Sequence, residues 1–115
     1  MIELFCHCGA VRITIPALPE TVTSCNCSVC RRLAGLWGYY ARADVRIAGE
    51  TDGYESGDRT LSLRRCKVCG CTTHWQTLLP DYDRMGVNMR NLDPALLAAI
   101  PIRRLDGADT WEYLD

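Results

Sequence analysis

Eight cysteines fall into three short clusters in this chain of 115 residues. The clusters are CHC at residues 6–8, CNCSVC at residues 25–30 and CKVCGC at residues 66–71. Disulfide bonding, thiol redox chemistry and metal binding each favour a different spacing of thiols. In the first and third clusters a Cys-Gly pair follows, and a glycine with positive φ lets the chain fold back around a metal and turn its backbone N–H groups toward the sulfurs. The pattern therefore favours metal binding.

The first and third clusters together supply the four thiolates of a closed zinc site. Zinc on four sulfurs at ~2.3 Å is tetrahedral, and one cluster rarely surrounds the ion alone. We therefore pair the two arms and predict a structural zinc that joins the start of the chain to its second half and contributes to folding. The predicted ligands are Cys6, Cys8, Cys66 and Cys69.

Disulfide bonding and redox chemistry fit these four thiols less well than zinc does. Cross-cluster disulfides need an oxidising compartment, and the N-terminal segment lacks the features of a secretory signal. A thioredoxin-like CxxC should open a helix after a strand in a βαβ pattern, which this sequence lacks.

The second cluster supplies three further sulfurs from one local turn. Its cysteines are Cys25, Cys27 and Cys30. Three protein ligands leave one position of a tetrahedral zinc for water or substrate, as in catalytic sites, unless a fourth ligand closes it. The candidates for that fourth ligand are Cys71, His74 and His7, of which we interpret His74 first as a strand residue. Zinc on three thiolates acidifies water poorly but can hold an incoming thiol as thiolate, so we expect a thiol substrate.

Composition and charge limit the class of protein. The chain is 48% hydrophobic and 23% charged with a net charge of −1, which fits one globular domain over residues 1–115. Such a charge indicates neither a nucleic acid nor an anionic membrane as partner. No segment approaches the ~20 apolar residues of a membrane span, so we expect a cytoplasmic protein.

The elements that must position these thiols are mostly strands. Apolar residues alternate with other residues in three segments, residues 11–15, 61–63 and 85–89, at the period of a half-buried strand. Residues 36–41 and 72–78 are rich in aromatic and β-branched side chains. Turn residues lie between these segments at 16–20, 48–53, 55–58 and 79–83. The sequence predicts a mainly antiparallel β fold.

Two short helices are expected. SVCRRLAG at residues 28–35 predicts one that ends at Gly35, directly after the second cysteine cluster. Asp93 followed by Pro94 is typical of a helix N-cap with proline in the first turn.

Four segments together resemble a known family. In order along the chain, CHCGAV, CNCSVCRR, CKVCGC and GVNMRNLD are similar to the glutathione-dependent formaldehyde-activating enzyme family, which includes centromere protein V. The resemblance covers residues 6 to about 94. It implies a β-tent or Mss4-like fold with small antiparallel sheets held by two zinc ions. The structural zinc would lie on Cys6, Cys8, Cys66 and Cys69, and the catalytic zinc on Cys25, Cys27 and Cys30.

The resemblance also implies an activity. It is that of a carbon–sulfur lyase that reversibly joins formaldehyde to glutathione as S-hydroxymethylglutathione. Arg31, Arg32 and Arg90 could hold the carboxylates of glutathione. Trp37, Tyr39 and Trp75 are candidate pocket walls, although we interpret each of them first as a core residue.

Two features depart from the family pattern. The chain begins five residues before its first cysteine and is shorter than we expect of members that act on glutathione. Cys71 is an additional thiol, which we interpret as a small buried hydrophobic residue.

Three hypotheses of different classes follow. The first is a zinc enzyme acting on a thiol–aldehyde adduct, the second a non-catalytic binding module stabilised by zinc, and the third a thiol-based reductase resembling methionine sulfoxide reductases of the B type. An open metal position facing a pocket favours the first, a fourth protein ligand the second, and a lone exposed cysteine of low pKa the third.

Overall fold

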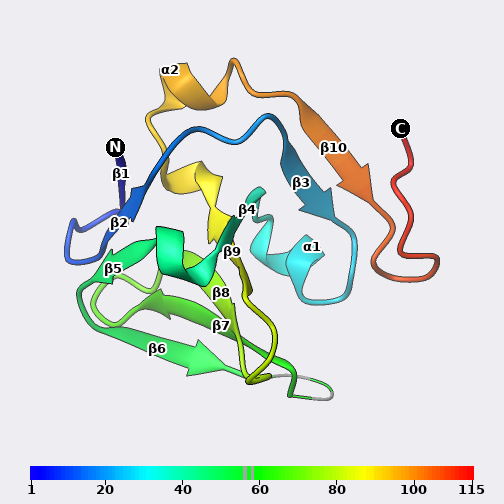
Figure 1. Cartoon of the computed structure of the whole chain (residues 1–115), viewed down its shortest axis with the longest axis horizontal. Coiled ribbons are helices and arrows are strands. Elements are labelled where there is room, and N and C mark those ends of the chain that lie inside the picture. Colours follow the sequence, from blue (N-terminus) through cyan, green and yellow to red (C-terminus); the bar gives the residue numbers. More distant parts are fainter. Residues whose placement is uncertain (56, 58) are drawn as a thin grey trace.

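The protein forms two β-sheets in the computed structural model, which describes residues 1–55, 57 and 59–115 (Figure 1). The smaller sheet has the order β1 (Ile2–Phe5), β2 (Arg12–Ile15) and β5 (Arg46–Ala48). The larger sheet has the order β10 (Ile102–Leu105), β3 (Val22–Cys25), β4 (Trp37–Ala41), β9 (Arg84–Asn88), β8 (Thr72–Thr77), β7 (Leu61–Cys66) and β6 (Thr51–Tyr54). The mainly β fold with small sheets predicted from the sequence is confirmed.

One strand pair departs from the antiparallel expectation. β10 runs parallel to β3, with Ile102 opposite Val22 and Leu105 opposite Cys25. A parallel pair needs a long connection, and here nearly the whole chain separates the two strands. Since Leu105 lies opposite Cys25, β10 ends beside the second cysteine cluster.

The strands follow the predicted alternation where one face is solvated. In β2, Ile13 and Ile15 are buried while Arg12 is exposed. The pattern differs in β9, where Met85 through Asn88 are all buried because β9 lies centrally between β4 and β8. A central strand covered on both faces cannot show alternation in its burial.

Both predicted helices are present and short. α1 spans Cys30–Leu33, and its end differs by one residue from the prediction, because Ala34 rather than Gly35 takes the left-handed conformation, with φ of 55°. Gly35 serves another purpose, since a Cβ there would lie 2.7 Å from an atom of the Trp37 ring. α2 spans Pro94–Leu97, and Asp93 caps it as predicted by accepting a hydrogen bond from the N–H of Ala95 at 2.9 Å.

Two single-turn 3₁₀ helices complete the chain, η1 (Arg42–Asp44) and η2 (Met89–Asn91). The expected turns at 16–20 and 79–83 connect strands. The turn expected at 48–53 is narrower, because β5 ends at Ala48 and β6 begins at Thr51. Of the turn expected at 55–58, residues 56 and 58 lie outside the described part of the chain.

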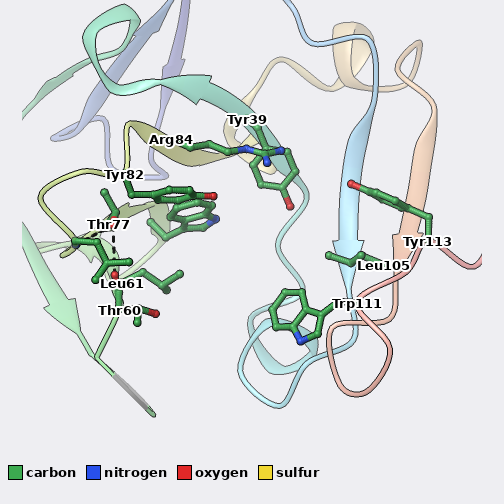
Figure 2. A pocket seen from close by; sticks show the side chains of 11 residues that line it. Tyr39, Thr60, Leu61, Thr77, Tyr82, Arg84, Leu105, Trp111 and Tyr113 are labelled. Atoms are coloured by element: carbon green, nitrogen blue, oxygen red, sulfur yellow. Dashed lines mark hydrogen bonds between the residues drawn. The ribbon is translucent and has the colours of Figure 1, made fainter.

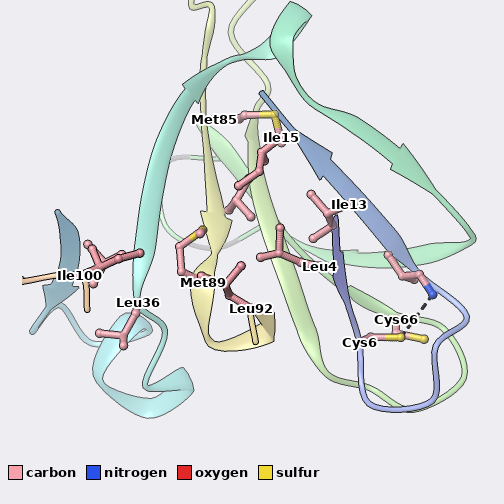
Figure 3. Close-up of a cluster of buried hydrophobic side chains, with 13 residues drawn as sticks. Leu4, Cys6, Ile13, Ile15, Leu36, Cys66, Met85, Met89, Leu92 and Ile100 are labelled. Atoms are coloured by element: carbon pink, nitrogen blue, oxygen red, sulfur yellow. Dashed lines mark hydrogen bonds between the residues drawn. The ribbon is translucent and has the colours of Figure 1, made fainter. Parts of the chain in front are cut away.

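The core lies between the two sheets and extends to the cysteines (Figure 3). Leu4 and Ile13 from the small sheet and Met89 from the start of η2 are fully buried there. Cys6 and Cys66 belong to the same buried cluster. The first metal-ligand set is therefore continuous with the hydrophobic core. No helix among the described residues is long and apolar enough to cross a membrane.

Candidate metal centres

Two matching turns bring the first and third cysteine clusters together. Cys6 follows β1, and Cys66 is the last residue of β7. The chain then reverses at Gly9 and Gly70, with φ of 81° and 78°, as the Cys-Gly pairs predicted. These positive φ values suit glycine, which has no Cβ to clash.

The four sulfurs of this cluster have the spacing of a metal site. The Sγ atoms of Cys6, Cys8, Cys66 and Cys69 all lie within 4.8 Å of one another. Cys8 Sγ lies 3.7 Å from both Cys6 Sγ and Cys66 Sγ. A tetrahedral zinc with ~2.3 Å bonds places its sulfurs ~3.8 Å apart, so these four residues fit the ion. All eight cysteines are free thiols, which contradicts the disulfide hypothesis.

Backbone N–H groups point at these sulfurs. Val11 N donates to Cys6 Sγ at 3.2 Å, and Ala10 N donates to Cys8 Sγ at 3.4 Å. The N–H of Cys71 is the main reason that the pKa of the Cys69 thiol is lowered to about 5. Such donors favour the thiolate, which is the form that binds a metal.

The second cluster forms where β3 passes into α1. Cys25 ends β3, Cys30 begins α1, and Cys27 lies in the loop between them. Their three Sγ atoms also lie within 4.8 Å of one another. Burial raises the pKa of the Cys27 thiol, but the N–H of Cys30 and the neighbouring thiols outweigh it, so that this pKa is lowered. The N–H of Cys30 lies 3.4 Å from Cys27 Sγ.

A buried indole supports the metal interpretation of this second cluster. Trp37 is 1% exposed, and its Nε1 is buried without a hydrogen-bond partner among the residues described. Burial strongly raises the pKa of the Cys30 thiol, and the Trp37 side chain counteracts this in part, which places the indole beside that sulfur. A Cys30 thiolate in a metal site would accept this N–H, whereas a buried N–H without a partner is costly.

The three-sulfur cluster borders a hollow of about 300 Å³. Cys25 and Cys30 line it together with three cationic side chains, those of Arg31, Arg90 and Arg104. Arg104 lies 3.6 Å from Asp115, whereas Arg31 and Arg90 form no ion pair within the described part of the chain. The hollow is therefore suited to an anion that lies next to the sulfurs.

The other predicted site residues lie elsewhere. Arg32 points away from the hollow and donates from Nη1 to the carbonyl of Ser28 at 2.6 Å. Trp37 is in the core beside Cys30 and lines neither this hollow nor the larger pocket. Tyr39 and Trp75 line the larger pocket, which has a volume of about 540 Å³.

None of the fourth-ligand candidates joins the three-sulfur cluster in the described structure. Cys71 lies beside the four-cysteine cluster, where it accepts from the N–H of His7 and is close to Cys69. His74 is buried within β8, and its Nδ1 lies 2.9 Å from the Thr73 hydroxyl. Burial lowers the pKa of His74 to about 4, so the ring is neutral at pH 7.

Sequence reasoning missed the residues that hold the second cluster in place. Asn88 Oδ1 accepts from the N–H groups of Leu36 and Arg90, and its Nδ2 donates to the carbonyl of Thr72 at 2.9 Å. Asn91 donates to the same carbonyl. The GVNMRNLD segment carried this signal only through the family resemblance. Gly107 gave no signal at all, yet a Cβ there would collide with Cys25 Sγ.

Comparison with known proteins agrees with this arrangement. The family model described as glutathione-dependent formaldehyde-activating enzyme matches residues 1–101. A curated Halomonas elongata protein with the provisional name glutathione-dependent formaldehyde-activating enzyme is 38% identical over 75 residues, which cover 64% of this chain and 45% of that protein. The match thus spans less than half of that relative's length.

A solved structure shares the fold. The crystal structure of a Rhodobacter sphaeroides protein from a structural-genomics programme superposes with a TM-score of 0.73 at 31% identity, and the match covers 88% of this chain and 99% of that one. With the family model matched over most of the sequence and both cysteine sets assembled, this chain belongs to the glutathione-dependent formaldehyde-activating enzyme family.

Proposed function

We propose that the protein is a zinc-dependent carbon–sulfur lyase that makes or breaks a thiol–aldehyde adduct such as S-hydroxymethylglutathione. In this proposal Cys25, Cys27 and Cys30 hold the catalytic zinc. The structural zinc lies on Cys6, Cys8, Cys66 and Cys69. The observation that carries the proposal is the position of the three-sulfur cluster on a hollow with three arginines.

The reaction needs a thiolate, an aldehyde and a proton. Zinc bound to three cysteines supplies a position at which a fourth thiol is held as thiolate. The substrate sulfur forms a bond to the aldehyde carbon, the carbonyl electron pair moves to oxygen, and that oxygen takes up a proton equivalent to the one the thiol released. The reverse reaction breaks the same carbon–sulfur bond.

The chain's own residues bind and orient the thiol. Glutathione carries carboxylates, and the guanidinium groups of Arg31 and Arg90 lie on the hollow that Cys25 and Cys30 line. Hydrogen bonds between guanidinium and carboxylate groups are directional, so they fix the position of the sulfur as well as bind the molecule. Trp37 has a supporting role in this proposal, because its indole lies against Cys30 and not in the hollow.

Metal analysis of two serine variants tests the division of roles. We expect two zinc ions per wild-type chain and one in Cys27→Ser, with the circular dichroism spectrum unchanged and formation of S-hydroxymethylglutathione lost. Cys69→Ser should unfold, because its cluster is continuous with the core. If Cys27→Ser unfolded as fully as Cys69→Ser, both metal sites would be structural and the enzyme proposal would fail.

A further inference from the structure

A second and larger pocket lies beside the proposed catalytic centre, between the β8–β9 region and the C-terminal segment (Figure 2). In Figure 2 Leu105 and Trp111 lie on the side of the C-terminal segment and face Leu61 and Tyr82 across the pocket. Its volume of about 540 Å³ is in the range of small-molecule sites, ~300–1,000 Å³. The pocket is much larger than formaldehyde requires.

The walls of this pocket are aromatic. Five rings line it, those of Tyr39, Trp75, Tyr82, Trp111 and Tyr113. The Trp75 indole lies directly on β9, where only a glycine leaves room, since a Cβ on Gly86 would collide with Trp75 Nε1. Rings of this kind present large rigid apolar surfaces to a flat ligand. Glutathione, which is polar and charged, would leave these surfaces unused.

One cation lies among these rings. The Arg84 guanidinium lies 4.1 Å from the centre of the Tyr39 ring. It forms no ion pair or hydrogen bond with any residue that the structure describes. Burial raises the pKa of Tyr39 to about 12, so its phenol stays neutral and leaves the Arg84 charge uncompensated. A ligand for this pocket therefore needs an anionic group.

Trp111 is held at the pocket under backbone strain. Its φ is 60°, which a bulky residue rarely adopts, and its N–H donates to the carbonyl of Asp106 at 2.7 Å. The side chain is nevertheless 70% exposed, so burial does not offset this strain. Strained residues of this kind concentrate at binding sites, where a ligand can cover the exposed ring.

The C-terminal segment connects this pocket to the three-sulfur cluster. Leu105 lies opposite Cys25 in the register of β10 and β3, and it lines both the aromatic pocket and the arginine hollow. Two residues further on, Gly107 packs against Cys25 and Cys27. A molecule that occupies the aromatic pocket thus lies next to the site where we place the thiol.

We propose that the aromatic pocket binds a flat aromatic group that carries an anionic substituent, with the ring against Trp111 and the anion at Arg84. This proposal rests on the proposed function, in which the pocket holds the aldehyde side of the adduct. The substrate class that fits is an aromatic aldehyde bearing a carboxylate. The carbon–sulfur bond forms as described above, with the same movement of electrons and proton.

Direct binding of 2-naphthoate tests the pocket without any turnover. We expect it to bind the zinc-loaded protein and to quench tryptophan fluorescence. Trp111→Gly, which removes the ring and suits the positive φ, should weaken this binding about tenfold, the loss expected for one aromatic contact. Arg84→Gln should weaken 2-naphthoate by a similar factor and leave the uncharged 2-naphthylmethanol unaffected. The matched controls Tyr54→Ala and Arg46→Gln alter exposed residues that do not line the pocket and should change neither Kd.

Three results would overturn this assignment. They are absence of 2-naphthoate binding at about 1 mM, equal affinity for 2-naphthylmethanol in the wild type, or binding that neither Trp111→Gly nor Arg84→Gln weakens. Cys27→Ser separates this proposal from the proposed function, since it should retain 2-naphthoate binding while losing lyase activity. Wild-type binding without any lyase activity would contradict the lyase and leave the pocket as a ligand site. Lyase activity without 2-naphthoate binding would contradict the pocket alone.

Discussion

At the residue scale, neighbouring arginines have different surroundings. Arg31 lines the hollow next to Cys30 and has no ion-pair partner among the described residues, whereas the Arg32 guanidinium donates to the Ser28 carbonyl. Two adjacent residues of α1 with the same side chain thus offer a matched comparison.

Replacing Arg31 by Gln should weaken glutathione use specifically. We expect KM for glutathione to rise about 3–10-fold with kcat nearly unchanged, because one charge-assisted contact to a carboxylate is lost. KM for 2-mercaptoethanol, which has no carboxylate, should not change. Steady-state kinetics of Arg31→Gln beside Arg32→Gln measure this, and an equal rise in both variants would count against a role for the hollow.

His74 should make the protein less stable in acid. Burial lowers the pKa of His74 to about 4, while an unfolded histidine has a pKa near 6.5. Below pH 6.5 the unfolded chain therefore binds a proton that the folded chain refuses, and stability falls with pH down to about 4. The linkage amounts to about 2 kcal/mol between pH 7 and 5.

Urea unfolding of wild type and His74→Gln at both pH values, with zinc in excess, isolates this contribution. Zinc loss affects both proteins alike, so the stability that the wild type loses between pH 7 and 5 should exceed that of the variant by this amount. Equal losses would mean that His74 is not buried as the neutral ring.

The metal-ligand residues could be read from the sequence, because cysteine spacing and the Cys-Gly turns are local features. The two clusters assemble as predicted, with Gly9 and Gly70 in the expected conformation. The roles of Trp37 and Cys71 could not be read in the same way. An indole against Cys30 and a thiol beside Cys69 result from the packing of distant segments, which residue type alone does not encode.

At the element scale, β9 and η2 hold the loop that follows α1. The Asn88 side chain makes three hydrogen bonds, to Leu36, Arg90 and Thr72. It thus connects the segment after the second cysteine cluster to the strand that begins after the third. Strand alternation in the sequence located β9 correctly, but it gave no reason for an asparagine at the end of that strand.

Asn88→Ala should destabilise the fold by about 3 kcal/mol, since three hydrogen bonds of about 1 kcal/mol each are lost in a buried place. Asn91→Ala serves as a control, because its amide reaches Thr72 and the Asn88 carbonyl and should cost about 1–2 kcal/mol. Chemical denaturation measures both. A smaller effect at Asn88 than at Asn91 would contradict this account of the brace.

Secondary structure was predictable where one face of an element meets water. β2 and α2 followed from alternation and from the Asp-Pro cap. The end of α1 was displaced because Gly35 is required by the Trp37 ring, a tertiary constraint that takes precedence over the usual glycine at a helix end. β10 was not expected at all, since its pairing with β3 depends on residues about eighty positions apart.

At the scale of the whole molecule, the two cysteine sets do different things to the chain. The four-cysteine set joins residues 58 positions apart and is part of the core, whereas the three-cysteine set lies within one turn at the end of β3. Both sets were predictable from the sequence. The aromatic pocket was not, because its walls come from β4, β8, β9 and the C-terminal segment, which only the folded sheet brings together.

The long separation of the first metal set also affects biosynthesis. Cys8 leaves the ribosome 58 residues before Cys66, which at ~5–20 residues per second corresponds to ~3–12 s. During this interval the nascent N-terminal thiols have no partner arm to complete their tetrahedron, although the three thiols at residues 25–30 are already complete as a local set. Metal capture on the growing polypeptide therefore begins at the second cluster, and the ion that holds the core arrives last.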